Sequence, residues 1–164
     1  MNSQNKTDGV KLMLDDLSVG QIFRSESYVI DAEKIKAFAS EFDPQPFHLD
    51  EEAAVGTFFN ELVASGWHTA GITMRLLVGS LPIAGGLVGA GTEITWPRPT
   101  RPGDCLTVES EVMEIKPSTK NKERGMVTVR STTTNQDGKT VQIVTSRMVV
   151  PRRVQETLNS SADS

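Results

Sequence analysis

Residues 66–79 read GWHTAGITMRLLVG, and this stretch determines the fold class. Arg75 is its only charged residue, and apolar side chains occupy positions on nearly every side of the helix that the segment would form. A helix of this kind buries its surface against the rest of the protein. We therefore expect a helix that follows Gly66 and runs through Leu77 to about Gly79, enclosed by the other elements of the domain.

The chain after this helix has the pattern of antiparallel strands. In residues 106–111 and 127–130 apolar and polar side chains largely alternate, and residues 141–150 are rich in β-branched side chains. The sequence NQDG at residues 135–138 indicates a hairpin, because Asp-Gly accepts the positive φ of a tight turn. One enclosed helix and a run of antiparallel strands predict an α+β domain whose sheet wraps around the helix.

Shorter elements are expected before the central helix. Residues 23–30 resemble a strand, and Asp31 can cap a helix whose apolar side chains follow at helical spacing. This helix should end at Asp43, because the residue before Pro44 avoids the helical region. Asp50 can cap a short helical turn.

The composition suits one globular domain. The 164 residues carry 17 basic and 21 acidic side chains, and the net charge of −4 argues against general nucleic-acid binding. Cys105 is the single cysteine, which excludes an intrachain disulfide and cysteine-rich zinc sites. We expect one domain over residues 11–153 with flexible tails at 1–10 and 154–164.

No signal for export or membrane insertion is visible. The polar first residues lack the apolar stretch of a signal peptide, and the most apolar segment, residues 62–88, is interrupted by charge, proline and glycine. These features predict a cytoplasmic protein that does not bind a membrane.

The stretch FDPQPFHLD, residues 42–50, is the densest group of polar side chains. Asp43 and His48 lie in a segment stiffened by Pro44 and Pro46, and the fixed proline φ angles lower the cost of holding both groups in place. An imidazole with a nearby carboxylate can activate water or move a proton at neutral pH. In the alternative interpretation, Asp43 only caps backbone groups and His48 is a hydrogen-bonded, partly buried structural residue.

A second group, ASGWHT at residues 64–69, lies where the central helix begins. Exposed N–H groups and the helix dipole favour an oxygen that gains negative charge at this position, and Gly66 has no side chain to block its approach. A tightly packed helix start is the alternative for Gly66, and His68 is either a second catalytic group or a structural histidine.

These two groups, in this order, resemble the MaoC-like acyl dehydratases, relatives of the R-specific enoyl-CoA hydratases with the hotdog fold. The hydratase motif of that family is Asp-x-Asn-Pro-aliphatic-His, and Asp43-Pro-Gln-Pro-Phe-His48 keeps its Asp, second Pro and His. Residues 38–50, 63–69 and WPRPTRPGD at 96–104 are also similar to the family. Gln45 and Phe47 depart from the motif, which affects substrate choice more than reaction type.

The resemblance implies reversible hydration of trans-2-enoyl thioesters to (R)-3-hydroxyacyl thioesters, a reaction of fatty acid metabolism. Asp43 and His48 would hold the water, and the Gly66 N–H would bind the thioester oxygen. The substrate-binding residues would be Gln45, Phe47, Ser65 and Trp67. The acyl group would be carried on coenzyme A or an acyl carrier, without a metal or redox cofactor, by a homodimer or higher homo-oligomer.

Three alternatives remain open on the sequence. A hotdog thioesterase would need a carboxylate on the central helix, where residues 67–77 contain none. A non-catalytic acyl-thioester-binding protein would keep the pocket without the reaction. A metal site would use His48, Asp50 and His68, whose types are suitable ligands. In addition, the basic side chains between Lys116 and Arg130 could bind coenzyme A phosphates or form a solvated loop.

Overall fold

The computed structural model describes residues 9–154 of the chain. Its helical elements are η1 Leu14–Asp16, α1 Ala32–Phe42, α2 Pro46–Leu49, α3 Glu51–Ala54 and α4 Gly66–Ser80. Its strands are β1 Ile22–Arg24, β2 Tyr28–Val29, β3 Val88–Thr95, β4 Cys105–Pro117, β5 Arg124–Thr134 and β6 Thr140–Pro151. Among these residues, no helix combines the length and the apolar character needed to cross a membrane. The predicted tails lie almost wholly outside the described residues.

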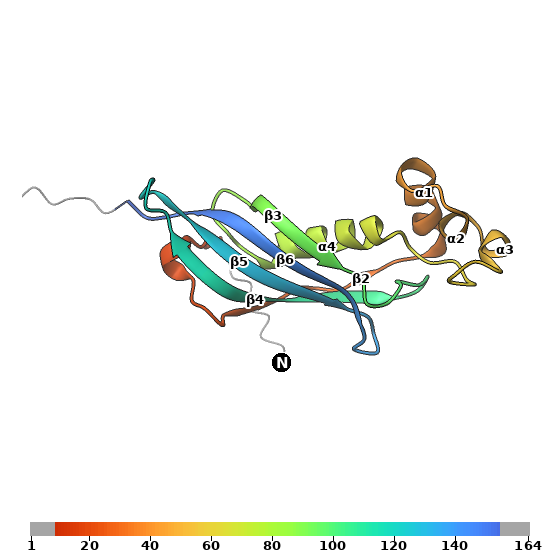
Figure 1. Cartoon of the computed structure of the whole chain (residues 1–164). Helices are drawn as coiled ribbons and strands as arrows, with labels where there is room; N and C mark the ends of the chain where they lie inside the picture. The colour runs from red at the N-terminus through yellow and green to blue at the C-terminus, as the bar shows by residue number, and fades with distance from the viewer. Residues whose placement is uncertain (1–8, 155–164) are drawn as a thin grey trace, which may run out of the picture.

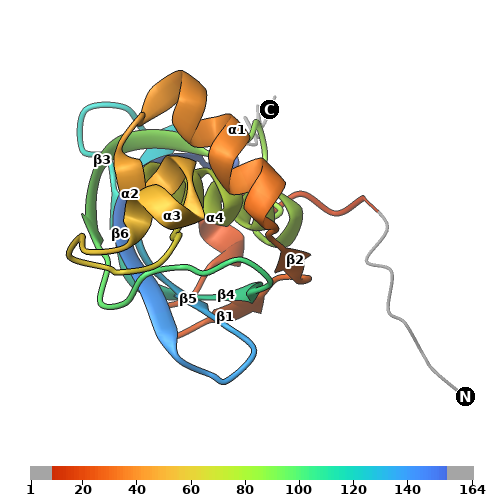
Figure 2. The same ribbon diagram turned by 90° about the vertical axis from the view of Figure 1, so that its right-hand side faces the viewer.

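All of the strands belong to one antiparallel sheet. The order is β1-β4-β5-β6-β3, and β2 pairs with the beginning of β4. The sheet curves around α4 (Figure 2), while α1, α2 and α3 lie together at one end of the molecule and the turn between β4 and β5 lies at the other (Figure 1). The predicted α+β architecture, a wrapped antiparallel sheet with one long helix, is confirmed.

The core lies between α4 and the concave side of the sheet. The side chains of α4 that face the strands are buried, as are those on the inner side of β4, β5 and β6. The outer face of α4 is uncovered, however: Trp67, Met74 and Val78 are 60%, 44% and 62% exposed. The prediction of a fully enclosed helix was wrong for the single chain, because one sheet covers only one side of a helix.

The sequence patterns before α4 predicted only some of the elements that the structure contains. Asp31 and Asp50 cap α1 and α3 as predicted, and α1 ends at Phe42. The predicted strand over residues 23–30 is divided into β1 and β2. Residues 46–49, expected to continue as a proline-stiffened loop, form the short helix α2. Proline suits the first turn of a helix, since its missing N–H has no partner there.

Candidate active site

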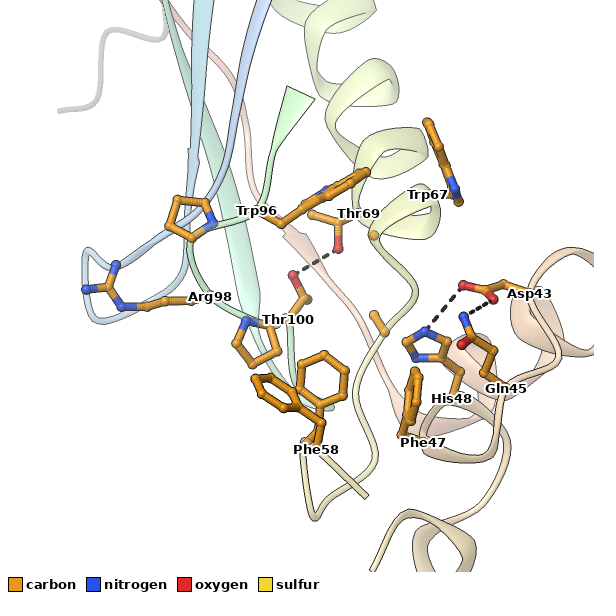
Figure 3. A pocket seen from close by; sticks show the side chains of 15 residues that line it. Asp43, Gln45, Phe47, His48, Phe58, Trp67, Thr69, Trp96, Arg98 and Thr100 are labelled. Atoms are coloured by element: carbon orange, nitrogen blue, oxygen red, sulfur yellow. Dashed lines mark hydrogen bonds and ion pairs between the residues drawn. The ribbon is translucent and has the colours of Figure 1, made fainter. Parts of the chain in front are cut away.

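A cavity of about 580 Å³ opens where α1, α2, the beginning of α4 and the segment between β3 and β4 meet (Figure 3). Most of its wall is aromatic or proline, with a few polar groups. The lining residues are Asp43, Gln45, Phe47, His48, Phe58, Phe59, Ala64, Gly66, Trp67, Thr69, Trp96, Pro97, Arg98, Pro99 and Thr100. A concave, largely apolar site with a small number of convergent polar groups is typical of small-molecule binding.

His48 is held through Nδ1 and directs Nε2 towards Asp43. The ring is buried on α2, and Nδ1 lies 2.7 Å from the carbonyl oxygen of Val63. Because a carbonyl can only accept, Nδ1 carries the hydrogen, and Nε2 of the neutral ring has a free lone pair. Nε2 lies 3.3 Å from Oδ2 of Asp43. Phe47 packs edge-on against the imidazole, with 4.6 Å between ring centroids.

Asp43 is the C-cap of α1 and lies beside His48 in the cavity wall (Figure 3). The Gln45 side-chain amide donates to its Oδ1 at 2.6 Å. Burial raises the pKa of Asp43, but hydrogen bonds from Ser65 and Gln45 outweigh that effect. The pKa is lowered below its ordinary value of 3.8. Asp43 is therefore a carboxylate at neutral pH and can only accept hydrogen bonds.

The beginning of α4 supplies the opposite wall. Ser65 is its N-cap and accepts the Trp67 N–H at 3.2 Å. Gly66 is the first helical residue, so its N–H has no acceptor within the helix. Thr69 donates to Thr100 at 2.9 Å, which ties α4 to the segment that leads into β4. The helix start thus presents an N–H donor and the positive end of the helix dipole to the cavity.

The structure brings most of the residues predicted for the site to one place. Asp43, His48, Gly66, Gln45, Phe47 and Trp67 all line the cavity. Ser65 is fully buried behind this wall, where it caps α4 and hydrogen-bonds to Asp43. His68 is directed away from the cavity and stacks on Phe38 at 4.6 Å. Its Nδ1 is buried and has no hydrogen-bond partner among the described residues. Burial, followed by the nearby charge of Lys34, lowers the pKa of His68.

The residues of the alternative metal site are not gathered. Asp50 accepts the N–H groups of Glu52 and Ala53 at the beginning of α3, and His68 faces α1. Among residues 9–154, no three His, Cys, Asp or Glu side chains are placed to hold an ion together. The basic side chains Lys116 and Arg124 lie near the β4–β5 turn, at the opposite end of the sheet from α1–α3 (Figure 1).

Several lining residues were not predicted as site residues. Phe58 and Phe59 come from the loop before α4, and Trp96, Arg98 and Thr100 come from the segment after β3. Residues 96–104 were singled out as similar to a family motif, but nothing in the sequence places them beside Gly66. That contact depends on how β3 pairs with β6.

A family model described as "MaoC like domain" matches residues 17–135. The chain belongs to the MaoC-like domain family. The architecture agrees with this assignment: a MaoC-like dehydratase structure from Rhodospirillum rubrum is 58% identical, with a TM-score of 0.85, and the match covers 87% of this chain and 99% of that one. The fold is thus the hotdog fold expected from the sequence.

Three further proteins are similar to this chain. YdeM from Bacillus subtilis is 38% identical over 76% of this chain and 89% of its own. A 3-hydroxybutyryl-CoA dehydratase from Methylorubrum extorquens is 34% identical over 65% of this chain and 67% of its own. The R-hydratase PhaJ1 from Pseudomonas aeruginosa is 29% identical, has a TM-score of 0.69, and is matched over 87% of this chain and 88% of that one.

Proposed function

We propose that the protein catalyses the reversible hydration of trans-2-enoyl thioesters to (R)-3-hydroxyacyl thioesters. The observation that carries this proposal is that Asp43 and His48, 3.3 Å apart, line the same aromatic-rich cavity as Gly66, the first residue of α4. Relatives named as a 3-hydroxybutyryl-CoA dehydratase and an R-hydratase support the same type of reaction.

In the proposed reaction, one water donates its hydrogens to Asp43 and to Nε2 of His48. Both groups are acceptors, because Asp43 is ionised and the hydrogen of the neutral His48 ring is on Nδ1. The water oxygen forms a bond to C3 of the enoyl group while its proton passes to the pair. The π electrons move to the thioester oxygen. The pair then gives the proton to C2 as the enolate returns to the thioester carbonyl. Dehydration is the reverse sequence.

The negative charge that develops during this step is placed at the beginning of α4. The Gly66 N–H and the helix dipole would stabilise the enolate oxygen, as oxyanion-binding donors do in acyl chemistry. The thioester itself delocalises the charge, so the proposed reaction uses no metal or redox cofactor. Gln45 orients the carboxylate of Asp43, and Phe47 and Trp67 would contact the substrate.

The proposed substrate is an acyl group on coenzyme A or an acyl carrier, which would place the protein in fatty acid metabolism. We also propose that the protein is cytoplasmic, which cell fractionation would test. The exposed face of α4 and the edge of β3, which pairs with no strand other than β6 within residues 9–154, support a homodimer, since apolar side chains and a free strand edge are commonly covered by a second chain.

Loss of the conjugated absorbance of crotonyl-CoA on addition of the protein tests the proposed function. The Asp43→Asn variant is the control, because it keeps the shape of the side chain and removes the carboxylate. Binding of crotonyl-CoA without any change in its absorbance would contradict the proposal and favour an acyl-thioester-binding protein.

A further inference from the structure

Trp96 forms the part of the cavity wall that lies against the beginning of α4. A Cβ placed on Gly66 would lie only 2.8 Å from Cε2 of the Trp96 indole. Trp67, the next residue along α4, meets the Trp96 ring edge to face, with 5.5 Å between centroids. The position of this indole therefore determines the shape of the space beside the Gly66 N–H.

The indole is held from behind by a buried glutamine. Its Nε1–H donates to Oε1 of Gln142 on β6 at 2.8 Å. Gln142 is fully buried, and its Nε2 donates to Oγ1 of Thr73 on α4 at 3.0 Å. Thr73 and Thr133 on β5 share a hydrogen bond of 2.7 Å. The glutamine carbonyl thus faces Trp96 and its amide nitrogen faces α4, so the side chain is fixed at both ends.

This chain of hydrogen bonds is unusual in its surroundings. The side chains between α4 and the sheet are mostly Val, Leu and Ile, and an apolar residue at position 142 would avoid the cost of burying an amide. A fully bonded buried network restricts its members to one arrangement. Here the network ends at Trp96 in the cavity wall. A fixed position of this ring would determine where a bound substrate lies.

We propose that Gln142 is a positioning residue for the hydration reaction, which it serves by holding Trp96 against Gly66 without touching the substrate. The inference rests on the proposed function, because it concerns the same reaction. If the Trp96 ring moves, the thioester oxygen loses its fixed position relative to the Gly66 N–H, and small displacements of reacting groups have large effects on rate.

The test compares the steady-state kinetics of crotonyl-CoA hydration in Gln142→Met, Trp96→Phe and the double variant. Each single variant should lower kcat by about 10- to 100-fold with little change in KM, because the transition state is affected more than binding. The double variant should be no slower than either single variant, since Gln142 acts through Trp96. Unchanged kcat in Gln142→Met, or losses that multiply in the double variant, would overturn the proposal.

Three further variants separate an effect on the position of Trp96 from a general loss of stability. Thr73→Val removes the second anchor of Gln142 and should lower kcat, whereas Thr73→Ser keeps the hydroxyl and should restore it. Ser110→Ala is the matched control: it breaks a buried 2.8 Å hydrogen bond to Ser131, neither residue of which lines the cavity. It should lower the melting temperature without lowering kcat. An equal loss of kcat in Ser110→Ala would attribute the effect to stability alone.

A spectroscopic measurement distinguishes failure of this inference from failure of the proposed function. In a Trp67→Phe background, Trp96 is the remaining tryptophan of the chain. Adding Gln142→Met should increase quenching of its fluorescence by iodide, because the indole is released from its hydrogen bond. If the unmodified protein hydrates no enoyl thioester, the proposed function fails, while increased quenching would still support the arrangement. Unchanged quenching in the folded variant would overturn the role of Gln142 in holding Trp96.

Discussion

The indole of Trp96 lies so close to the backbone of Gly66 that position 66 has no room for a side chain. The three nearest ring atoms would be 2.8–3.0 Å from an added Cβ, which is shorter than normal carbon contacts. The φ angle of Gly66 is not positive, so the requirement for glycine here is steric rather than conformational. The sequence predicts a functional role for the small size of Gly66, but it does not identify Trp96 as the residue that approaches it.

Gly66→Ala should therefore displace Trp96 or the first turn of α4. We expect kcat for crotonyl-CoA to fall by about 10²-fold or more, as when an oxyanion donor is lost, and stability to fall by about 1–3 kcal/mol through overpacking. Gly79→Ala is the matched control on the same helix, since its Cβ would have no atom within 4 Å. It should keep its activity and be slightly stabilised. Normal activity in Gly66→Ala would contradict the proposed oxyanion site.

Asp43→Asn and His48→Gln should each reduce kcat by about 10²–10⁴-fold, the range for loss of general acid–base help. Because both side chains would hold one water, the double variant should be little slower than either single variant. Both variants should still bind butyryl-CoA, a saturated thioester, which calorimetry can measure. Independent losses that multiply would show that the two groups do not share a water.

The pH dependence should respond to Gln45. The lowered pKa of Asp43 keeps the carboxylate ionised in the native protein at and above its ordinary value of 3.8. Its contribution to stability is thus present above that pH and is lost as the pH falls through the native pKa. Gln45→Leu removes one hydrogen bond that lowers this pKa, so the acid limb of the pH–stability profile should move to higher pH. Gln21→Leu, outside the cavity, should leave the profile unchanged; a shift to lower pH in Gln45→Leu would contradict the prediction.

Arg98 supplies a positive charge at the cavity and suggests a contact with the phosphates of coenzyme A. We expect Arg98→Ala to raise the KM for crotonyl-CoA by about 10-fold, the loss expected for one charge-assisted hydrogen bond. The KM for the N-acetylcysteamine thioester of crotonate, which lacks phosphates, should not change. Arg124→Ala, at the other end of the sheet, is the control. If Arg124→Ala raised the KM for crotonyl-CoA and Arg98→Ala did not, the basic segment between Lys116 and Arg130 would be favoured as the phosphate site.

Val78→Asp should shift the proposed homodimer towards monomers. Val78 lies on the exposed face of α4 with Met74 and Trp67, and a buried unpaired charge strongly weakens an apolar interface. Light scattering at micromolar concentration measures the change. Val19→Asp is a matched control, because Val19 is 64% exposed but lies on the loop before β1. A monomeric unmodified protein would contradict the dimer itself.

The sequence by itself determined the elements whose signals are local. The near-uniform apolarity of residues 66–79 predicted α4, alternation predicted β4 and β5, and Asp31 and Asp50 were recognised as caps. The motif from Asp43 to His48 also predicted that these two side chains lie together, and their atoms are 3.3 Å apart.

Only the tertiary structure decided which distant groups meet that pair. Val63 selects the tautomer of His48, the indole of Trp96 lies against Gly66, and Gln142 holds that indole from the far side of the core. These contacts join residues that are 15 to 46 positions apart. The packing of α4 into a curved sheet determines them, and hydrophobic periodicity carries no information on which strand lies beside which turn of the helix.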